Sequence, residues 1–142
     1  METLLKEQLW SYIAGNNPEL MYDLQEEYQV SEYLEKKVSS VMKEAEDLLE
    51  QGLPAITVQE ICMERMTGEL RPSKFQYIKN ILEEEFSVTY ELLLKSGMLT
   101  LEVINIMQCC ERIFQRLGFS EETADDRRLR YAVMGEISNY LE

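Results

Sequence analysis

The residue types that usually carry out chemistry are scarce in this chain. It contains no histidine, so the commonest general base, the commonest metal ligand and the side chain that changes charge near neutral pH are all missing. Its three cysteines are Cys62, Cys109 and Cys110, and none of them forms the two-residue-spaced pair of a zinc site. These counts exclude most familiar hydrolase and metalloenzyme mechanisms, and they predict no catalytic residue, no metal ligand and no cofactor.

Carboxylates are the remaining candidates for acid-base or metal chemistry. Glu60 with Glu64 and the run from Glu83 to Glu85 supply oxygen ligands on predicted helices. Carboxylate-bridged metal sites in helical bundles also use a histidine three residues after a glutamate, and charge runs usually form the solvated face of an amphipathic helix. We expect solvated or structural roles, with a weak site for a hard cation as the alternative.

The cysteines have two predicted environments. Cys62 and Cys110 fall on the apolar faces of their helices, where a thiol packs as a small hydrophobe. Cys109 lies at the edge of such a face, so its exposure decides whether the thiol can react. An odd number of cysteines without a disulfide pattern favours a reducing, cytoplasmic setting.

The one dense basic cluster consists of Arg127, Arg128 and Arg130. It lies near the start of the last predicted helix, where the helix dipole disfavours cations. Asp126 can pair with Arg130, and Asp125 with Arg128, at helical spacing. Local ion pairs are the simpler interpretation, and a patch that binds an anion or an acidic partner is the alternative.

Three aromatic residues lie off the clearest apolar stripes: Trp10, Tyr22 and Tyr33. Tyrosine and tryptophan fill helical cores, but they are also enriched at protein interfaces. We therefore expect these three residues to form an exposed contact patch.

The elements that must position these residues are helices. Apolar residues recur every three or four positions, and no stretch alternates as a strand does. The pattern predicts seven helices, over about 5–13, 18–28, 32–51, 57–67, 74–96, 100–117 and 124–141, the fifth bent near Ser87. Capping boxes are predicted at Thr57 and Ser73, and a single cap at Thr100. Four glycines stand at expected helix ends: Gly52, Gly68, Gly97 and Gly118.

Short connections between so many helices predict an all-α fold, a compact multihelical array of about six to eight helices. We expect one helical domain over residues 1–142, with an N-terminal helical subdomain over 1–53 as the alternative. The chain is long enough to bury a substantial core.

The charge balance limits the partners. With 27 acidic and 14 basic residues the formal net charge is -13, which argues against direct binding to nucleic acid or to an anionic membrane. No window approaches 18 consecutive apolar residues, and the first residues lack the charged and apolar regions of a secretion signal. We expect a cytoplasmic protein.

Taken in order, the predicted helix starts and ends, with the apolar residues between them, resemble an uncharacterised all-helical bacterial family. It is a domain of unknown function found mainly in Bacteroidetes and often on mobile elements. The resemblance covers most of the chain and rests on Leu9, Tyr12, Ile13, Asn17, Pro18, Gly52, Glu60, the turn from Gly68 to Phe75, Ile78, Ile81, Leu82, Glu85, Phe86, Gly135, Ile137, Tyr140 and Leu141. The turn departs from the family pattern by one extra residue and Pro72. The resemblance implies a helical fold and a bacterial origin, and it implies no activity.

Three functions follow as hypotheses. The first is a non-enzymatic protein-interaction module that binds a protein partner or forms a homodimer, through its acidic first third or the aromatic patch. The second is an accessory role in the DNA transactions of a mobile element, by an acidic surface that imitates DNA or by weak nucleic-acid contact through the arginine cluster. An enzyme is the third and least favoured hypothesis. Carboxylates could still carry out acid-base chemistry, but no motif places two of them around a cavity.

Overall fold

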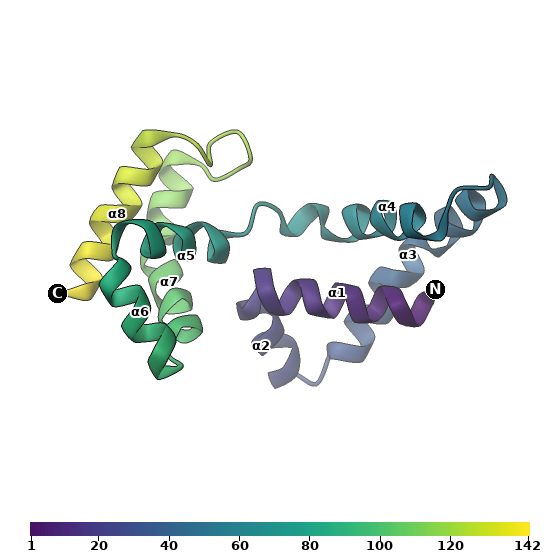
Figure 1. Cartoon of the computed structure of the whole chain (residues 1–142), viewed down its shortest axis with the longest axis horizontal. Helices are drawn as coiled ribbons and strands as arrows, with labels where there is room; N and C mark the ends of the chain where they lie inside the picture. The colour runs from purple at the N-terminus through teal and green to yellow at the C-terminus, as the bar shows by residue number, and fades with distance from the viewer. The chain divides into compact units, whose positions relative to one another are not determined.

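The computed structural model describes residues 1–142 and contains eight α-helices, one 3-10 turn and no strand (Figure 1). It confirms the all-α multihelical array that the sequence predicts. Contacts between the helices fall into two groups, which divide the chain into compact units at Met1–Leu70 and Arg71–Glu142. The boundary considered after residue 53 therefore falls inside the first unit, because the helix that follows it shares that unit's core.

The first unit consists of α1 (Glu2–Asn16), α2 (Pro18–Glu26), α3 (Val30–Glu50), α4 (Ala55–Thr67) and the 3-10 turn η1 (Gly68–Leu70). Helices α1, α3 and α4 pack against one another, and α2 packs against α1 and α3. Their buried residues recur at helical spacing and form one core: Leu5, Leu9, Ile13, Val38, Val41, Ala45, Val58, Cys62 and Met66.

The second unit consists of α5 (Lys74–Glu85), α6 (Ser87–Ser96), α7 (Leu99–Leu117) and α8 (Arg127–Leu141). Helix α7 contacts each of the other three helices and is the centre of the unit. Its buried residues, spaced by three or four, are Leu99, Val103, Ile106, Cys110 and Phe114. The core is completed by residues of α5 and α8: Phe75, Ile78, Ile81, Leu82, Leu129, Val133 and Ile137.

Several predicted helix ends are confirmed. The Ser73 hydroxyl accepts a hydrogen bond from the backbone N–H of Gln76 at 3.0 Å and caps α5. Gly97 ends α6 with a left-handed φ of 76°, and Gly118 ends α7 with a φ of 82°. Glycine adopts these backbone angles without the steric cost that a Cβ would bring.

Other predicted boundaries are wrong. Helix α4 begins at Ala55, directly after Pro54, so Thr57 lies inside its first turn and caps nothing. Helix α7 is preceded by Met98, so Thr100 also lies inside the helix. The last helix begins at Arg127 and not at 124, because residues 120–126 form turns in which the Thr123 hydroxyl accepts from the Ser120 N–H at 2.8 Å.

The predicted bend near Ser87 is a complete break. Phe86 has φ -132° and ψ 49°, which is outside the helical region, and it both ends α5 and precedes α6. Its side chain packs partly against the core of the second unit. The break turns α6 into a separate helix that contacts α5 and α7.

Candidate functional site

Helix α6 is the only α-helix of the chain without a buried residue. On one side it contributes Tyr90 and Leu93, which pack partly buried against the core of the second unit. On the other side Val88 and Leu92, one turn apart, are 74% and 65% exposed. A helix of this kind presents an apolar surface that its own unit does not cover.

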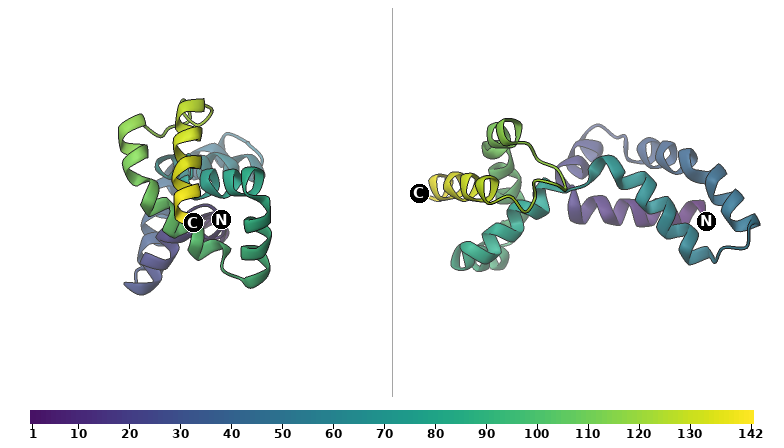
Figure 2. Two further views of the ribbon diagram at one scale, coloured as in Figure 1. Left: turned by 90° about the vertical axis from the view of Figure 1, so that its left-hand side faces the viewer. Right: turned by 90° about the horizontal axis from the view of Figure 1, so that it is seen from above.

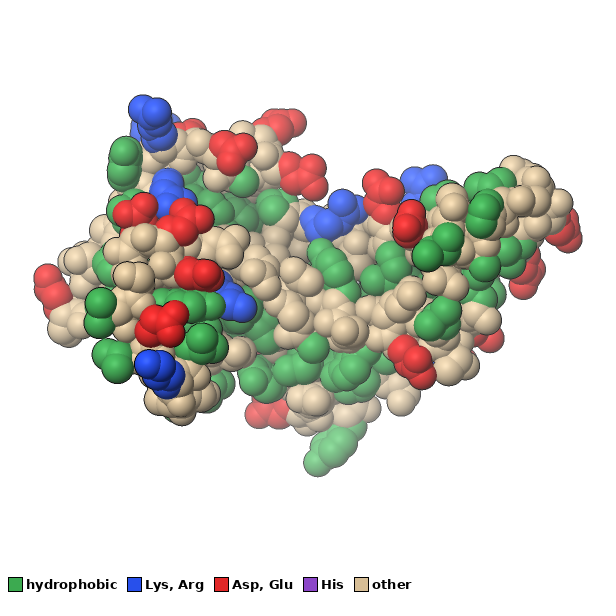
Figure 3. Space-filling model, viewed as in Figure 1, with side chains coloured by type: hydrophobic (Ala, Val, Ile, Leu, Met, Phe, Trp, Pro, Cys, Tyr) green, Lys and Arg blue, Asp and Glu red, His purple; other side chains and the backbone are tan.

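The charged residues Glu91 and Lys95 lie on the same side of α6 as Val88 and Leu92, whereas Leu94, which is 51% exposed, lies on the opposite flank of the helix because it is two residues after Leu92. We call Val88, Glu91, Leu92 and Lys95 the α6 face. Figure 3 shows hydrophobic side chains at the surface over α6, with acidic and basic side chains among them. One negative and one positive charge cancel within the face, whereas the whole chain carries -13.

The three predicted aromatic contact residues all belong to the first unit. Trp10 on α1 and Tyr33 on α3 are half-buried and pack against that unit's core. Only Tyr22 on α2 is exposed. The structure therefore places two of the three against the core, because α1 and α3 use more of their circumference for packing than the clearest stripes indicate.

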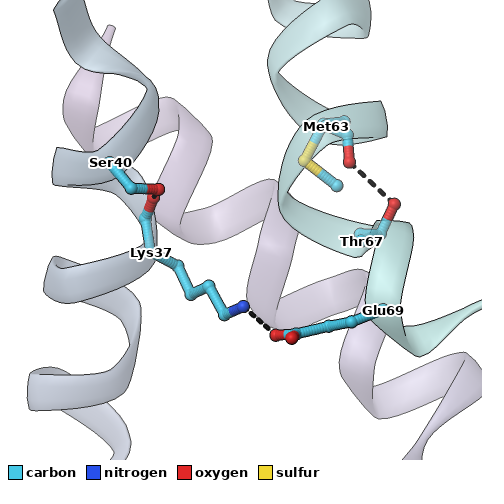
Figure 4. A network of polar contacts seen from close by, with 5 residues as sticks. All are labelled: Lys37, Ser40, Met63, Thr67 and Glu69. Atoms are coloured by element: carbon cyan, nitrogen blue, oxygen red, sulfur yellow. Dashed lines mark hydrogen bonds and ion pairs between the residues drawn. The ribbon is translucent and has the colours of Figure 1, made fainter.

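Tyr33 takes part in a small polar cluster between α3 and η1. The Lys37 ammonium lies 5.8 Å from the centre of the Tyr33 ring and forms an ion pair with Glu69 of η1 (Figure 4). The Ser40 hydroxyl donates to the Lys37 carbonyl at 2.6 Å. Burial raises the pKa of the Tyr33 hydroxyl. The cluster joins η1 to α3, and the charge of Lys37 is already matched by Glu69.

Of the three clustered arginines, Arg130 is engaged in ion pairs, and only Arg127 and Arg128 could contact an anion or an acidic partner. Arg130 donates to Glu84 at 2.8 Å and to Glu85 at 3.1 Å, both on α5. The predicted pairing of Asp126 with Arg130 is therefore wrong, and the Asp126 carboxylate instead caps α8 by accepting from the Arg128 N–H at 2.8 Å. Arg127 and Arg128 remain exposed at the surface.

The cysteines lie where the sequence places them. Cys62 and Cys110 are buried and Cys109 is exposed. Burial raises the pKa of the Cys110 thiol to about 12, far from that of a reactive thiolate. No group of three or more cysteine, aspartate or glutamate side chains is arranged to hold a metal ion. No helix combines the length and the apolar character needed to cross a membrane.

Comparisons with family models, with curated proteins and with solved structures each gave no match. The resemblance to a bacterial helical family stays a prediction.

The α6 face is the feature that sequence reasoning missed. Its signal was present, because Val88 and Leu92 are four residues apart and lie opposite Tyr90 and Leu93 on a helical wheel. The sequence shows apolar residues on both sides of this short segment, and the side that remains exposed cannot be identified without the packing of α5 and α7.

Proposed function

We propose that the chain is a non-enzymatic protein-interaction module that forms a homodimer through the α6 face. The observation that carries this proposal is the exposure of Val88 and Leu92, one turn apart, on a helix that buries none of its residues. Complete burial of one such aliphatic side chain is worth about 1.5–3 kcal/mol. A partner that covers the face therefore gains free energy that the isolated chain does not use.

The charges of the α6 face favour a second copy of the chain as the partner. Glu91 and Lys95 are four residues apart and lie on the same side of α6. When two α6 helices pack antiparallel about a two-fold axis level with residue 93, midway between Glu91 and Lys95, Glu91 of each copy lies beside Lys95 of the other. The two Leu92 side chains then lie close to each other, one residue from the axis. A two-fold interface needs a surface that complements itself in this way.

The neutrality of the face matters because each copy is strongly acidic. Two chains of charge -13 repel each other wherever their acidic surfaces meet. Contact through the α6 face places no net charge at the contact itself, because Glu91 and Lys95 cancel, and it adds two ion pairs. Two aliphatic side chains per copy form a patch that is small compared with a standard protein interface. We therefore expect a reversible dimer with a dissociation constant no tighter than about micromolar.

Sedimentation velocity over a range of protein concentrations tests the proposal. The mass should rise from 16.7 kDa toward twice that value, and Leu92→Glu should hold it at the monomer value. Ile56→Glu is the matched control, because Ile56 is 66% exposed on α4 of the first unit. A wild-type chain that stays monomeric up to several hundred micromolar, or equal loss of association in both variants, would contradict the proposal.

An accessory role in DNA transactions is the second candidate, and a separate observation favours it. The unit Met1–Leu70 contains 15 acidic and 5 basic residues, whereas Arg71–Glu142 contains 12 and 9. A concentrated acidic surface can occupy the DNA-binding groove of a basic protein. We expect the chain to displace fluorescent duplex DNA from such a protein in a salt-dependent manner, and no displacement at low salt would remove this candidate.

A further inference from the structure

A second surface of the chain, separate from the α6 face, lies between α7 and α8. These helices run antiparallel and side by side (Figures 1 and 2). A groove of about 880 Å³ separates their outer surfaces, and it is lined by Gln108, Cys109, Arg112, Ile113 and Arg116 of α7 and Ala132, Gly135, Glu136, Ser138 and Asn139 of α8. This volume is in the range of sites for small molecules, but the lining is more polar than such sites usually are. The groove therefore suits a charged ligand.

Two arginines dominate the groove. Arg112 and Arg116 are one turn apart on α7, and both are exposed. Neither takes part in an ion pair of the chain, whereas Arg65 and Arg130 do. Unpaired neighbouring arginines are unexpected in a chain with 27 acidic residues. A pair of guanidinium groups on one helix face matches the oxygens of a phosphate group, which accept paired hydrogen bonds from them.

Two small residues of α8, Ala132 and Gly135, line the side of the groove opposite the arginines. Gly135 lies in the interior of α8, and a Cβ placed there would meet nothing within 4 Å. Glycine weakens a helix interior relative to alanine, and neither packing nor a positive φ calls for it at this position. Gly135 and Ala132 instead leave space opposite the arginines. A residue that costs stability and opens a groove points to a ligand that occupies the space.

We propose that this groove binds a small phosphate monoester that carries hydroxyl groups. Arg112 and Arg116 hold the phosphate, whose double negative charge suits two guanidinium groups. Glu136, the one carboxylate in the lining, accepts a hydrogen bond from a ligand hydroxyl, and Asn139 and Ser138 offer further polar groups. The groove thus contacts both the phosphate and the hydroxyl groups of the ligand, whereas a free phosphate ion contacts the arginines alone.

Cys109 provides a direct readout, since it lines the groove and is the only exposed cysteine. Alkylation by iodoacetamide, a neutral reagent, is followed by mass spectrometry while glycerol 3-phosphate or inorganic phosphate is added at constant ionic strength. We expect saturable protection of Cys109 by both probes, with tighter binding of glycerol 3-phosphate. Equal affinity for the two probes would overturn the assignment of Glu136 and Asn139 and leave a site for phosphate alone.

The double variant Arg112→Gln, Arg116→Gln should weaken the protection at least about tenfold, because it removes charged hydrogen bonds to the ligand. The matched control is Arg127→Gln, Arg128→Gln, which removes the same charge from exposed positions outside the groove. Binding should be unchanged in the control. Equal weakening in both double variants, or no saturation with either probe, would show that only net charge matters and would overturn the proposal.

Discussion

Alanine substitution at two glycines of the second unit should change stability in opposite directions. Gly135 has helical backbone angles in the interior of α8, whereas Gly97 ends α6 with a φ of 76°. An added Cβ meets no atom within 4 Å at either position, so packing does not distinguish them and only the backbone does. Gly135→Ala should stabilise the chain by about 0.5–1 kcal/mol through helix propensity. Gly97→Ala should destabilise it by about 1 kcal/mol, because a left-handed angle is costly for alanine.

Equilibrium unfolding in urea, followed by circular dichroism, measures both free energies against the same wild-type reference. The two variants should differ by roughly 2 kcal/mol, with the wild type between them. A lower free energy of unfolding for Gly135→Ala would refute the reasoning, since it would mean that the added methyl group clashes with neighbouring atoms. Phosphate binding to the same variant is expected to weaken, because the new methyl group enters the α7–α8 groove.

Further predictions concern the core and the surface of the second unit. The Tyr77 hydroxyl is buried without a hydrogen-bond partner, so Tyr77→Phe should leave the free energy of unfolding unchanged or raise it by up to about 1 kcal/mol, and a clear loss would reveal a hidden partner. Burial raises the pKa of the Cys110 thiol from 9.0 to about 12. Because the folded state holds this proton more tightly, the contribution of this thiol to stability should be constant below pH 9 and should fall as the pH rises from 9 toward 12, by up to about 1.4 kcal/mol per pH unit. Cys110→Ala should unfold with a flatter alkaline slope, and an unaltered slope would assign the effect to other groups. Arg130→Met should cost less than about 1 kcal/mol in urea unfolding, since the ion pairs with Glu84 and Glu85 are on the surface; a larger cost would mean that they fix α8 on α5.

Helix periodicity predicted most of the fold, because each helix buries a stripe that repeats every three or four residues. Leu5, Leu9 and Ile13 of α1 are buried without exception, and so are Leu129, Val133 and Ile137 of α8. Capping was predicted less well. A threonine is a good cap only where the backbone leaves the helix, and Thr57 and Thr100 lie just inside helices that begin at Ala55 and Leu99.

The candidate sites depend on which side of a helix remains uncovered, and that is a property of the packed unit. Residues 74–96 read as one bent helix, since the break at Phe86 involves a residue with no special backbone preference. Only the break leaves Val88 and Leu92 on an uncovered side. Arg112 and Arg116 have the spacing of one turn in the sequence, but their groove depends on Gly135 of α8 lying opposite.

A mixing experiment tests the proposed dimer most directly. Glu91→Lys gives an α6 face with two positive charges, and Lys95→Glu gives one with two negative charges, so each variant alone should sediment as a monomer. An equimolar mixture should form a heterodimer at least as tight as the wild-type dimer, because each contact then joins opposite charges. A mixture that stays monomeric at concentrations where the wild type dimerises, or single variants that dimerise as the wild type does, would contradict association through the α6 face.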